Sequence, residues 1–318
     1  MIKKRVLVFG GSGLAGIAIK KEFEKDFIVS SPTREQCNLQ DFNQVIECID
    51  RFKPDLVINC AGLVGGILFN MQESSESLIQ NMNIGLNVTK GCVDCNVRDY
   101  IFLGSNCIYP NNIIKKIEEN DLLSSKLEST NRSYALAKIS TIQYINAVNI
   151  KYKKDYFAVM PPNLYGFNDT FHVNKSHVLQ SLIMKIDSAK RNNTKQIEIW
   201  GDGSPRREFL NTVDLAEGIK FLYNNKIELL KKIKSNDFPI INIGTGIDYK
   251  ITDLAYLVAK IIDYDISISY DTNKPNGTLS KLLDTSKINS LGWYSKIKIE
   301  EGIASLYESY KNGNFRTN

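Results

Sequence analysis

The sequence predicts an α/β fold: a doubly wound parallel sheet, accompanied by a smaller α/β domain that is assembled from discontinuous C-terminal segments. In the first half of the chain, short apolar runs alternate with amphipathic stretches of helical period, which is the pattern of βαβ units. After residue 166 this alternation loosens. A length of 318 residues also exceeds the usual size of a single core, which favours one large domain with a satellite.

The first half supplies the strands and helices of the main sheet. The predicted strands are 4–10, 27–31, 55–61, 99–105 and 155–166, and the helices between them are 14–25, 41–52, 78–95 and 133–150. The strands are apolar along their whole length because helices cover both faces of a parallel sheet. Ligands of such sheets bind at the carboxyl ends of the strands.

The second half divides between two domains. The expected elements are a helix at 177–191, a strand at 197–201, a strand at 239–244, a helix at 251–265, a strand at 266–271, a loop at 272–284 and a helix at 299–313. The segment at 207–225 is expected to lead the chain back to the main sheet. The strand at 239–244 is expected to rejoin the main sheet. Residues 1–165 plus about 208–245 then form the larger domain, and about 166–207 plus 246–318 form the smaller one.

Composition excludes several classes of protein. Forty Lys plus Arg against thirty-five Asp plus Glu leave a net charge of +5, too modest to predict a nucleic-acid partner. No apolar run approaches the length of about 18 residues needed for a membrane span. The six cysteines follow no secretion signal, so reduced thiols in the cytoplasm are expected. Cys92 and Cys95 form a lone CxxC, and no metal site is predicted.

A glycine-rich loop directly follows the first strand and opens the first helix. Gly10, Gly13 and Gly16 have GxxGxxG spacing within FGGSGLAG. Glycine allows a tight turn, and the backbone N–H groups of such a loop can approach a pyrophosphate at the helix N-terminus. The sequence therefore predicts a Rossmann-type dinucleotide site. Its loop residues are Gly10, Gly11, Ser12, Gly13, Leu14, Ala15 and Gly16.

The segment after the second strand favours NADPH over NADH. An NAD site usually has an acid here for the ribose 2′-hydroxyl, whereas a 2′-phosphate requires cations and hydroxyls. Ser30, Thr33 and Arg34 all precede the first acid, Glu35. Arg34 is thus a candidate 2′-phosphate ligand, although it could equally be a solvated surface charge. Ala61, in the small-residue end of the third strand, is expected to lie under the cofactor, or simply to pack there.

A tyrosine and a lysine four residues apart begin the helix at 133–150, and a serine ends the preceding strand. The spacing of Tyr134 and Lys138 alone is a weak signal, because such pairs often decorate a solvated helix face. With the glycine loop and Ser105 in the right order, the combination indicates a reductase. Ser105 would hydrogen-bond a substrate carbonyl and Tyr134 would donate a proton. The Lys138 ammonium is expected to favour the ionised phenol.

These motifs resemble the extended short-chain dehydrogenase/reductase superfamily and, more finely, the GDP-L-fucose synthase family. The resemblance covers nearly the whole chain through FLGSNCIYP, SYALAKI, PPNLYG, FHVNKSHV, WGDGSPRREFL, INIGTG and KPNGTLSKLLD. It implies that the larger domain binds NADP and the smaller one a GDP-linked 4-keto-6-deoxy sugar. It further implies C4 reduction with C3/C5 epimerisation, and a homodimer.

The family's residue roles transfer onto matching positions. Its epimerisation base and acid match Cys107 and His177, although each read alone would more often be structural. A C4 ketone acidifies the protons on C3 and C5, which such a pair could move. The resemblance places the cofactor against Leu103, Gly104, Ser105, Asn106, Lys138, Pro161, Asn163, Leu164 and His177. It places the substrate against Asn163, Lys185, Trp200 and Arg207, of which Lys185 could instead be solvated and Trp200 part of a core.

Several positions depart from the family pattern. Asn106, Pro162 and Ser280 replace a usual serine, threonine and basic residue, and Pro32 replaces a second arginine near the 2′-phosphate. An altered sugar shell around intact hydride machinery favours an alternative function: C4 reduction alone, on a GDP-4-keto-6-deoxy-heptose of capsule or surface polysaccharide biosynthesis. A non-catalytic dinucleotide sensor is a remote alternative, because the chain keeps Ser105, Tyr134 and Lys138 whereas a sensor needs no proton donor.

Overall fold

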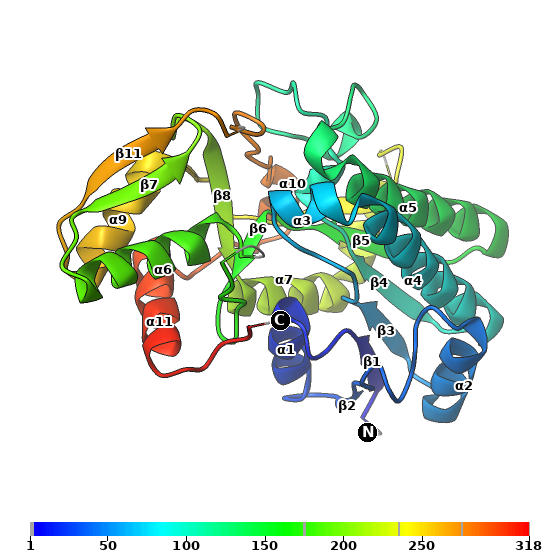
Figure 1. Cartoon of the computed structure of the whole chain (residues 1–318). Helices are drawn as coiled ribbons and strands as arrows, with labels where there is room; N and C mark the ends of the chain where they lie inside the picture. The colour runs from blue at the N-terminus through cyan, green and yellow to red at the C-terminus, as the bar shows by residue number, and fades with distance from the viewer. Residues whose placement is uncertain (1–2, 174–175, 235, 275, 318) are drawn as a thin grey trace.

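A six-stranded parallel sheet lies at the centre of the larger part of the protein, in the order β2-β1-β3-β4-β5-β9 (Figure 1). The computed structural model describes residues 3–173, 176–234, 236–274 and 276–317. The strands are β1 (Arg5–Phe9), β2 (Ile28–Ser30), β3 (Leu56–Asn59), β4 (Asp99–Leu103), β5 (Phe157–Met160) and β9 (Ile240–Asn242). Every neighbouring pair is parallel. The chain winds outward from β1 in both directions, which confirms the predicted fold class.

Helices cover both faces of this sheet. One face packs against α2 (Phe42–Phe52), α4 (Ser74–Asp94) and α5 (Arg132–Tyr152), and the other against α1 (Leu14–Phe23), α7 (Thr212–Asn224) and α8 (Lys226–Ile233). Successive residues of β1 alternate between the two cores: Leu7 and Phe9 enter the first, and Val6 and Val8 enter the second. This alternation is why the strand is apolar throughout.

Two small sheets lie beyond the main one. The first joins β6 (Asn163–Tyr165), β8 (Arg206–Asn211) and β10 (Asp248–Lys250), and the second joins β7 (Gln196–Trp200) to β11 (Ser267–Asp271). The predicted strand at 155–166 is therefore wrong as a single element: it divides into β5 in the main sheet and β6, which pairs with β8. Pro161 and Pro162 separate the two, and proline has no N–H to donate to a strand ladder.

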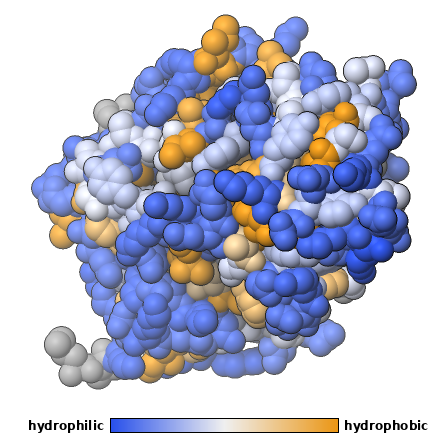
Figure 2. All heavy atoms as spheres, turned by 90° about the vertical axis from the view of Figure 1, so that its left-hand side faces the viewer, coloured by the Kyte–Doolittle hydropathy of each residue, from blue (hydrophilic) through white to orange (hydrophobic). Residues whose placement is uncertain are grey.

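A third core holds the smaller part together. Helices α6 (Val178–Arg191), α9 (Ile251–Ile262) and α11 (Ile299–Lys311) bury their apolar faces against β7 and one another. This part lies to the left in Figure 1, away from α4 and α5. On the face that it presents to solvent, hydrophilic residues predominate and hydrophobic ones are scattered (Figure 2). That face has the character of an ordinary solvated surface.

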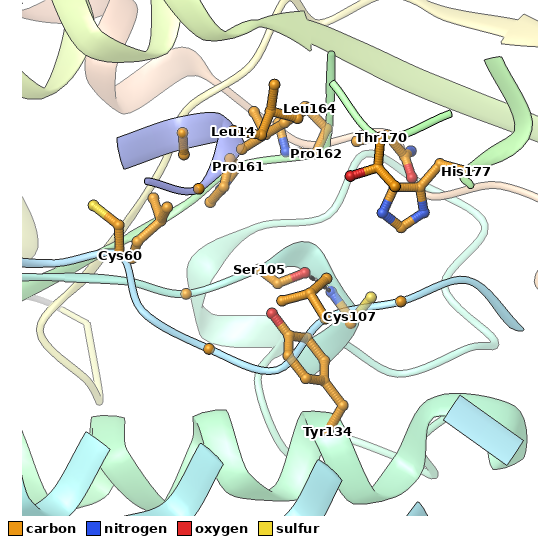
Figure 3. Close-up of a pocket in the computed structure, with 18 of the residues that line it drawn as sticks. Leu14, Cys60, Ser105, Cys107, Tyr134, Pro161, Pro162, Leu164, Thr170 and His177 are labelled. Atoms are coloured by element: carbon orange, nitrogen blue, oxygen red, sulfur yellow. Dashed lines mark hydrogen bonds between the residues drawn. The ribbon is translucent and has the colours of Figure 1, made fainter. Parts of the chain in front are cut away.

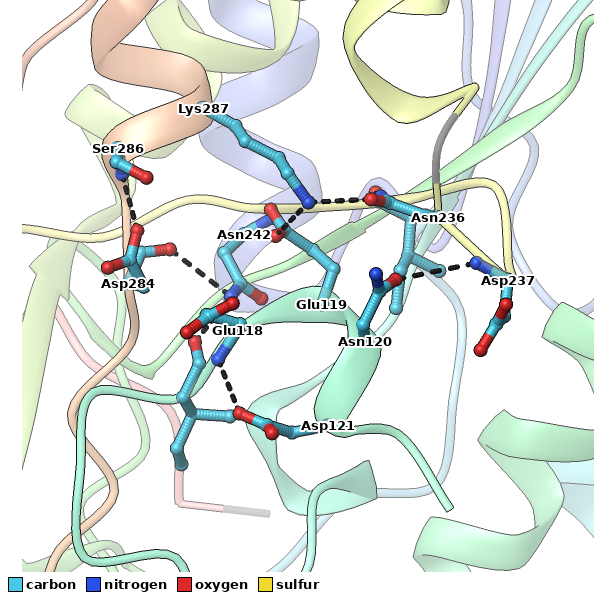
Figure 4. Close-up of polar contacts among 12 residues, drawn as sticks. Glu118, Glu119, Asn120, Asp121, Asn236, Asp237, Asn242, Asp284, Ser286 and Lys287 are labelled. Carbon is cyan, nitrogen blue, oxygen red and sulfur yellow. Dashed lines mark hydrogen bonds and ion pairs between the residues drawn. The ribbon is translucent and has the colours of Figure 1, made fainter. Parts of the chain in front are cut away.

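The segment between β4 and α5 is a long excursion with three short 3₁₀ helices, η1 (Asn106–Ile108), η2 (Glu119–Asp121) and η3 (Ser129–Asn131). A buried polar network ties it to β9 and to α10 (Ser286–Ser290) (Figure 4). The Glu119 carboxylate accepts from the backbone N–H of Asn242 at 3.0 Å and from Lys287 Nζ at 2.8 Å. The Asn242 amide also donates to the Ile117 carbonyl at 2.8 Å. The network fixes the path of the excursion at Ile117 and Glu119.

The remaining helix, α3 (Ile67–Gln72), immediately precedes α4. Within the described ranges, none of the helices is both long and apolar enough to cross a lipid bilayer. Nor do the described residues gather three or more His, Cys, Asp or Glu side chains in an arrangement that could hold a metal ion.

Candidate active site

A cavity of about 320 Å³ lies where the glycine loop meets the carboxyl ends of β4 and β5 (Figure 3). Its walls come from the start of α1, the segment after β4, the first turns of α5, and the segment that leads into α6. The predicted site residues that line it are Gly13, Leu14, Ala15, Gly16, Leu103, Gly104, Ser105, Asn106, Cys107, Tyr134, Lys138, Pro161, Asn163, Leu164 and His177. Such a volume at this edge of a doubly wound sheet suits a small-molecule site.

The glycine loop fits a dinucleotide because its backbone is closely packed and its glycines carry no side chains. Gly10 has a φ of +78°, and a Cβ there would lie 2.6 Å from the amide nitrogen of Ala61. A Cβ on Gly16 would overlap the Gly10 carbonyl oxygen. The Gly13 N–H donates to that same carbonyl at 3.0 Å, which closes the turn before α1. The N-terminal end of α1 is thereby exposed to the cavity, where its dipole and N–H groups favour a phosphate.

Ser105, Tyr134 and Lys138 lie together on one wall. Ser105 follows the end of β4, and its hydroxyl oxygen accepts from the Cys107 N–H at 3.2 Å. Tyr134 and Lys138 lie one helical turn apart near the start of α5 and are 7% and 4% exposed. Lys138 Nζ donates to the Leu103 carbonyl at 2.9 Å and lies 5.6 Å from the centroid of the Tyr134 ring. The tyrosine hydroxyl points toward the serine in Figure 3.

The electrostatics of this wall differ from the expectation. Burial raises the pKa of Tyr134, Cys107 adds to the rise, and a hydrogen bond with Ser105 opposes it. Burial likewise lowers the pKa of Lys138 to about 8, against the influence of Cys60. Desolvation, and not the expected influence of the Lys138 ammonium, thus dominates the pKa of Tyr134 in this structure. Tyr134 keeps its proton, as a proton donor must.

Cys107 and His177 approach the cavity from different walls. Cys107 lies in η1, two residues after Ser105, whereas His177 is the residue that caps the start of α6. In Figure 3 the imidazole enters from the α6 side and the thiol from the segment after β4. Burial lowers the pKa of His177. The two side chains therefore face the cavity from different sides.

Other predicted site residues lie outside the cavity lining. Lys185 Nζ donates to the Glu198 carbonyl at 2.7 Å, and Trp200, 39% exposed, lies under Lys274 with Nζ 5.4 Å from its ring. Arg207 Nη1 donates to the Thr278 carbonyl at 2.6 Å. All three belong to the smaller part: Lys185 is on α6, Trp200 on β7 and Arg207 on β8. The other predicted residues outside the lining are Gly10, Gly11, Ser12 and Ala61, which support the loop, and the exposed Arg34.

The cavity also has lining residues that the sequence analysis did not assign. They are Cys60, Gly62, Val64, Gly65, Asn70, Asp169, Thr170, Ser176 and Arg316. Cys60 and Gly62 flank Ala61 at the end of the third strand, and the motif FHVNKSHV contains Ser176, so proximity to an assigned residue or motif could have indicated them. Arg316 has no such signal, because it lies near the end of the chain and outside every motif.

Together, the glycine loop, Ser105 and the buried tyrosine and lysine define a nicotinamide-dinucleotide-dependent oxidoreductase. The comparisons agree. The sequence profile described as the NAD dependent epimerase/dehydratase family matches residues 6–244. The chain belongs to this family and, within it, to the GDP-L-fucose synthase family that its motifs resemble.

Known relatives match over almost the whole chain. The GDP-L-fucose synthase of Escherichia coli (strain K12) is 37% identical over 310 residues, covering 97% of each protein. A GDP-6-OMe-4-keto-L-xylo-heptose reductase from C. jejuni is 30% identical, with a TM-score of 0.90 over 98% of this chain and 99% of the other. A GDP-mannoheptose C4 reductase from Campylobacter jejuni, solved with NADP bound, is also 30% identical, with a TM-score of 0.86 over 97% and 98%.

Proposed function

We propose that this protein uses NADPH to reduce C4 of a GDP-linked 4-keto-6-deoxy sugar after epimerising C3 and C5 of the same ring. The observation that carries the proposal is the convergence of Ser105, Tyr134 and Lys138 with Cys107 and His177 around one cavity that also opens onto the glycine loop. The names of the relatives supply the substrate class, since both a GDP-L-fucose synthase and GDP-heptose reductases match the full chain.

The side chains divide the work in this proposal. Cys107 removes a proton next to the C4 ketone, and His177 returns one to the ring from the other wall. Ser105 donates a hydrogen bond to the C4 oxygen. Tyr134 then transfers its proton to that oxygen as the carbonyl becomes an alcohol. NADPH, when bound, supplies the hydride for C4. Lys138 beneath the tyrosine ring stabilises the phenolate that remains.

The proposal extends to the organisation of the chain. Residues 1–165 plus about 208–245 would bind NADPH, and about 166–207 plus 246–318 would bind the nucleotide sugar. Lys185, Trp200 and Arg207 of the second domain would contact the sugar nucleotide together with Asn163 of the first. A homodimer is also proposed, supported by the exposed apolar side chains of Leu136 and Ile150 on α5. A cytoplasmic location is proposed as well, and the six free thiols suit a reducing compartment.

A second candidate keeps the reduction but not the epimerisation. It is favoured by the heptose reductases among the similar structures and by Asn106 and Pro162, which line the cavity in place of the family's serine and threonine. The substrate would then be a GDP-4-keto-6-deoxy-heptose whose C3 and C5 are already set. The two candidates differ in whether protons on C3 and C5 exchange with solvent.

Turnover in deuterated water separates these candidates. The protein is incubated with NADPH and GDP-4-keto-6-deoxy-mannose or its heptose counterpart, and the product is examined by NMR. NADPH oxidation with deuterium at C3 and C5 supports the bifunctional enzyme. Oxidation without deuterium supports the C4 reductase, and no oxidation with either substrate contradicts both candidates.

Variants assign the steps. Tyr134→Phe should bind NADPH normally but lower kcat by about 10²- to 10⁴-fold, since it removes the proton donor. Cys107→Ser should abolish deuterium incorporation. Cys95→Ser, at a thiol outside the cavity lining, is the matched control and should behave as the unmodified protein. Equal deuterium incorporation in Cys107→Ser would remove the thiol from the mechanism.

A further inference from the structure

The C-terminal segment folds back onto the cavity instead of leaving the surface. The backbone N–H of Arg316 donates to the Asp169 carbonyl at 2.9 Å, and the Arg316 carbonyl accepts from the Phe171 N–H at 2.8 Å. These bonds make a parallel bridge between Thr170 and Arg316. Arg316 thereby reaches the cavity that Gly13 and Leu14 also line, although these residues are about 300 positions away in sequence.

An aromatic cluster anchors this segment, residues 314–317, which we call the C-terminal strap. The Phe315 ring centroid lies 5.4 Å from that of Phe171 and 5.4 Å from that of Tyr310, the latter on α11. The Phe171 and Tyr310 centroids are 4.6 Å apart. Aromatic packing of this kind, together with two backbone hydrogen bonds, gives the strap one defined path across the cavity wall.

The side chain of Arg316 is half-buried in that wall. It lines the same cavity as Gly13 and Leu14 of the glycine loop and as His177. Its Nε donates to the Asn168 carbonyl at 2.9 Å, which fixes the plane of the guanidinium. A guanidinium has further N–H donors on its terminal nitrogens, arranged as a fork that matches a phosphate.

Charge distinguishes Arg316 from the rest of the lining. Among the described residues that line the cavity, the basic side chains other than histidine are Lys138 and Arg316. Lys138 is occupied with the Leu103 carbonyl and the Tyr134 ring. The neighbouring carboxylate of Asp169 accepts from Gln180 and from the Thr170 N–H. Arg316 is thus the cation of this wall that the proposed catalytic steps do not use.

We propose that Arg316 binds the diphosphate of the nicotinamide dinucleotide, opposite the glycine loop. The inference rests on the proposed function for the identity of the cofactor. The loop GGSGLAG offers backbone N–H donors and a helix dipole but no charged side chain, so a guanidinium on the opposite wall complements it. The diphosphate of the sugar nucleotide is the less suitable ligand, because its candidate cations Lys185 and Arg207 lie outside this cavity lining.

The test is a titration of the protein with NADPH in the absence of any sugar nucleotide. Fluorescence of the reduced nicotinamide monitors binding. Arg316→Gln should raise the Kd for NADPH about tenfold and weaken its dependence on salt, because one charge-assisted contact is lost. The Kd of Arg316→Lys should lie between those of the unmodified protein and Arg316→Gln, since lysine keeps the charge but loses the forked geometry of the guanidinium. Lys311→Gln removes a positive charge from the end of α11 and is the matched control, with an unchanged Kd.

Each outcome decides the inference. An unchanged Kd in Arg316→Gln overturns it, including the case in which only the KM of the sugar nucleotide rises. If Arg316→Gln does not fold, hydrogen exchange of the strap in the unmodified protein decides: slower exchange with NADPH supports the contact, and equal exchange contradicts it. If the unmodified protein does not bind NADPH at all, the proposed function fails instead, and the two failures are distinguishable.

Discussion

Lys138 lies in an environment that differs strongly from water. It is 4% exposed, its Nζ lies 4.5 Å from the centroid of the Phe102 ring, and burial lowers its pKa from 10.5 to about 8. Between pH 8 and 10.5 the unfolded chain therefore holds a proton that the folded protein has released. The free energy of unfolding rises with pH wherever the unfolded state binds more protons. Below pH 8 the buried, protonated Lys138 thus lowers the free energy of unfolding. This cost decreases as the pH rises from 8 to 10.5.

We expect Lys138→Met to remove this pH dependence. From pH 7 to pH 10, the unmodified protein should gain on the order of 2 kcal/mol in free energy of unfolding relative to the variant. Urea denaturation at several pH values measures the difference. Lys21→Met, on the exposed side of α1, is the control and should follow the unmodified protein. Parallel curves for Lys138→Met and the unmodified protein would show that the ammonium is not desolvated.

At the scale of elements, the excursion between β4 and α5 has to hold Ser105 and Cys107 without regular structure. Its polar anchor is Glu119, 3% exposed, which accepts from the Asn242 backbone and from Lys287. By contrast, the ion pair of Lys115 with Glu118 in the same excursion has both side chains more than half exposed. A buried charge that loses its partner is costly, whereas an exposed pair contributes little.

Glu119→Ala should therefore destabilise the protein by about 3 kcal/mol, while Lys115→Ala should change stability by less than about 0.5 kcal/mol. Denaturant unfolding gives both values. Glu119→Ala should also lower the reductase activity, because the excursion that holds Ser105 and Cys107 loses an anchor. Similar stabilities for the two variants would mean that the network in Figure 4 does not anchor the excursion.

For the whole molecule, the cavity receives residues from the glycine loop, the main sheet, the segment before α6 and the C-terminal strap. A ligand bound there contacts segments that belong to separate cores. Because it binds only the folded chain, it stabilises the protein by mass action. The gain at 100 times the Kd is about 2.7 kcal/mol, which corresponds to about 4 °C in Tm for a chain of this length.

NADPH should produce this shift at lower concentration than NADH, because Arg34 and its neighbouring hydroxyls favour a 2′-phosphate. Thermal unfolding with each cofactor in turn measures the preference. In Arg34→Ala, NADPH and NADH should raise the Tm equally at equal concentration. Equal shifts in the unmodified protein would refute the choice of NADPH, and a preserved preference in Arg34→Ala would assign the 2′-phosphate to Ser30 and Thr33 alone.

The sequence by itself determined the features that depend on local spacing. Alternating apolar runs predicted the doubly wound sheet, since a period of two or 3.6 residues reflects which face is buried. The glycine loop and the YxxxK pair were recognisable because each chemistry needs its residues within one turn or one loop. The order of these motifs along the chain then brought Ser105, Tyr134 and Lys138 to the same end of the sheet.

Only the tertiary structure decided what depends on distant contacts. It divided the strand at 155–166 between two sheets, set the raised pKa of Tyr134 by burying it, and brought Asp169 and Arg316 to the cavity that the glycine loop also lines. It also put Lys185, Trp200 and Arg207 outside the cavity lining. Desolvation and the meeting of segments almost 300 residues apart arise from packing of the whole chain, so no local pattern encodes them.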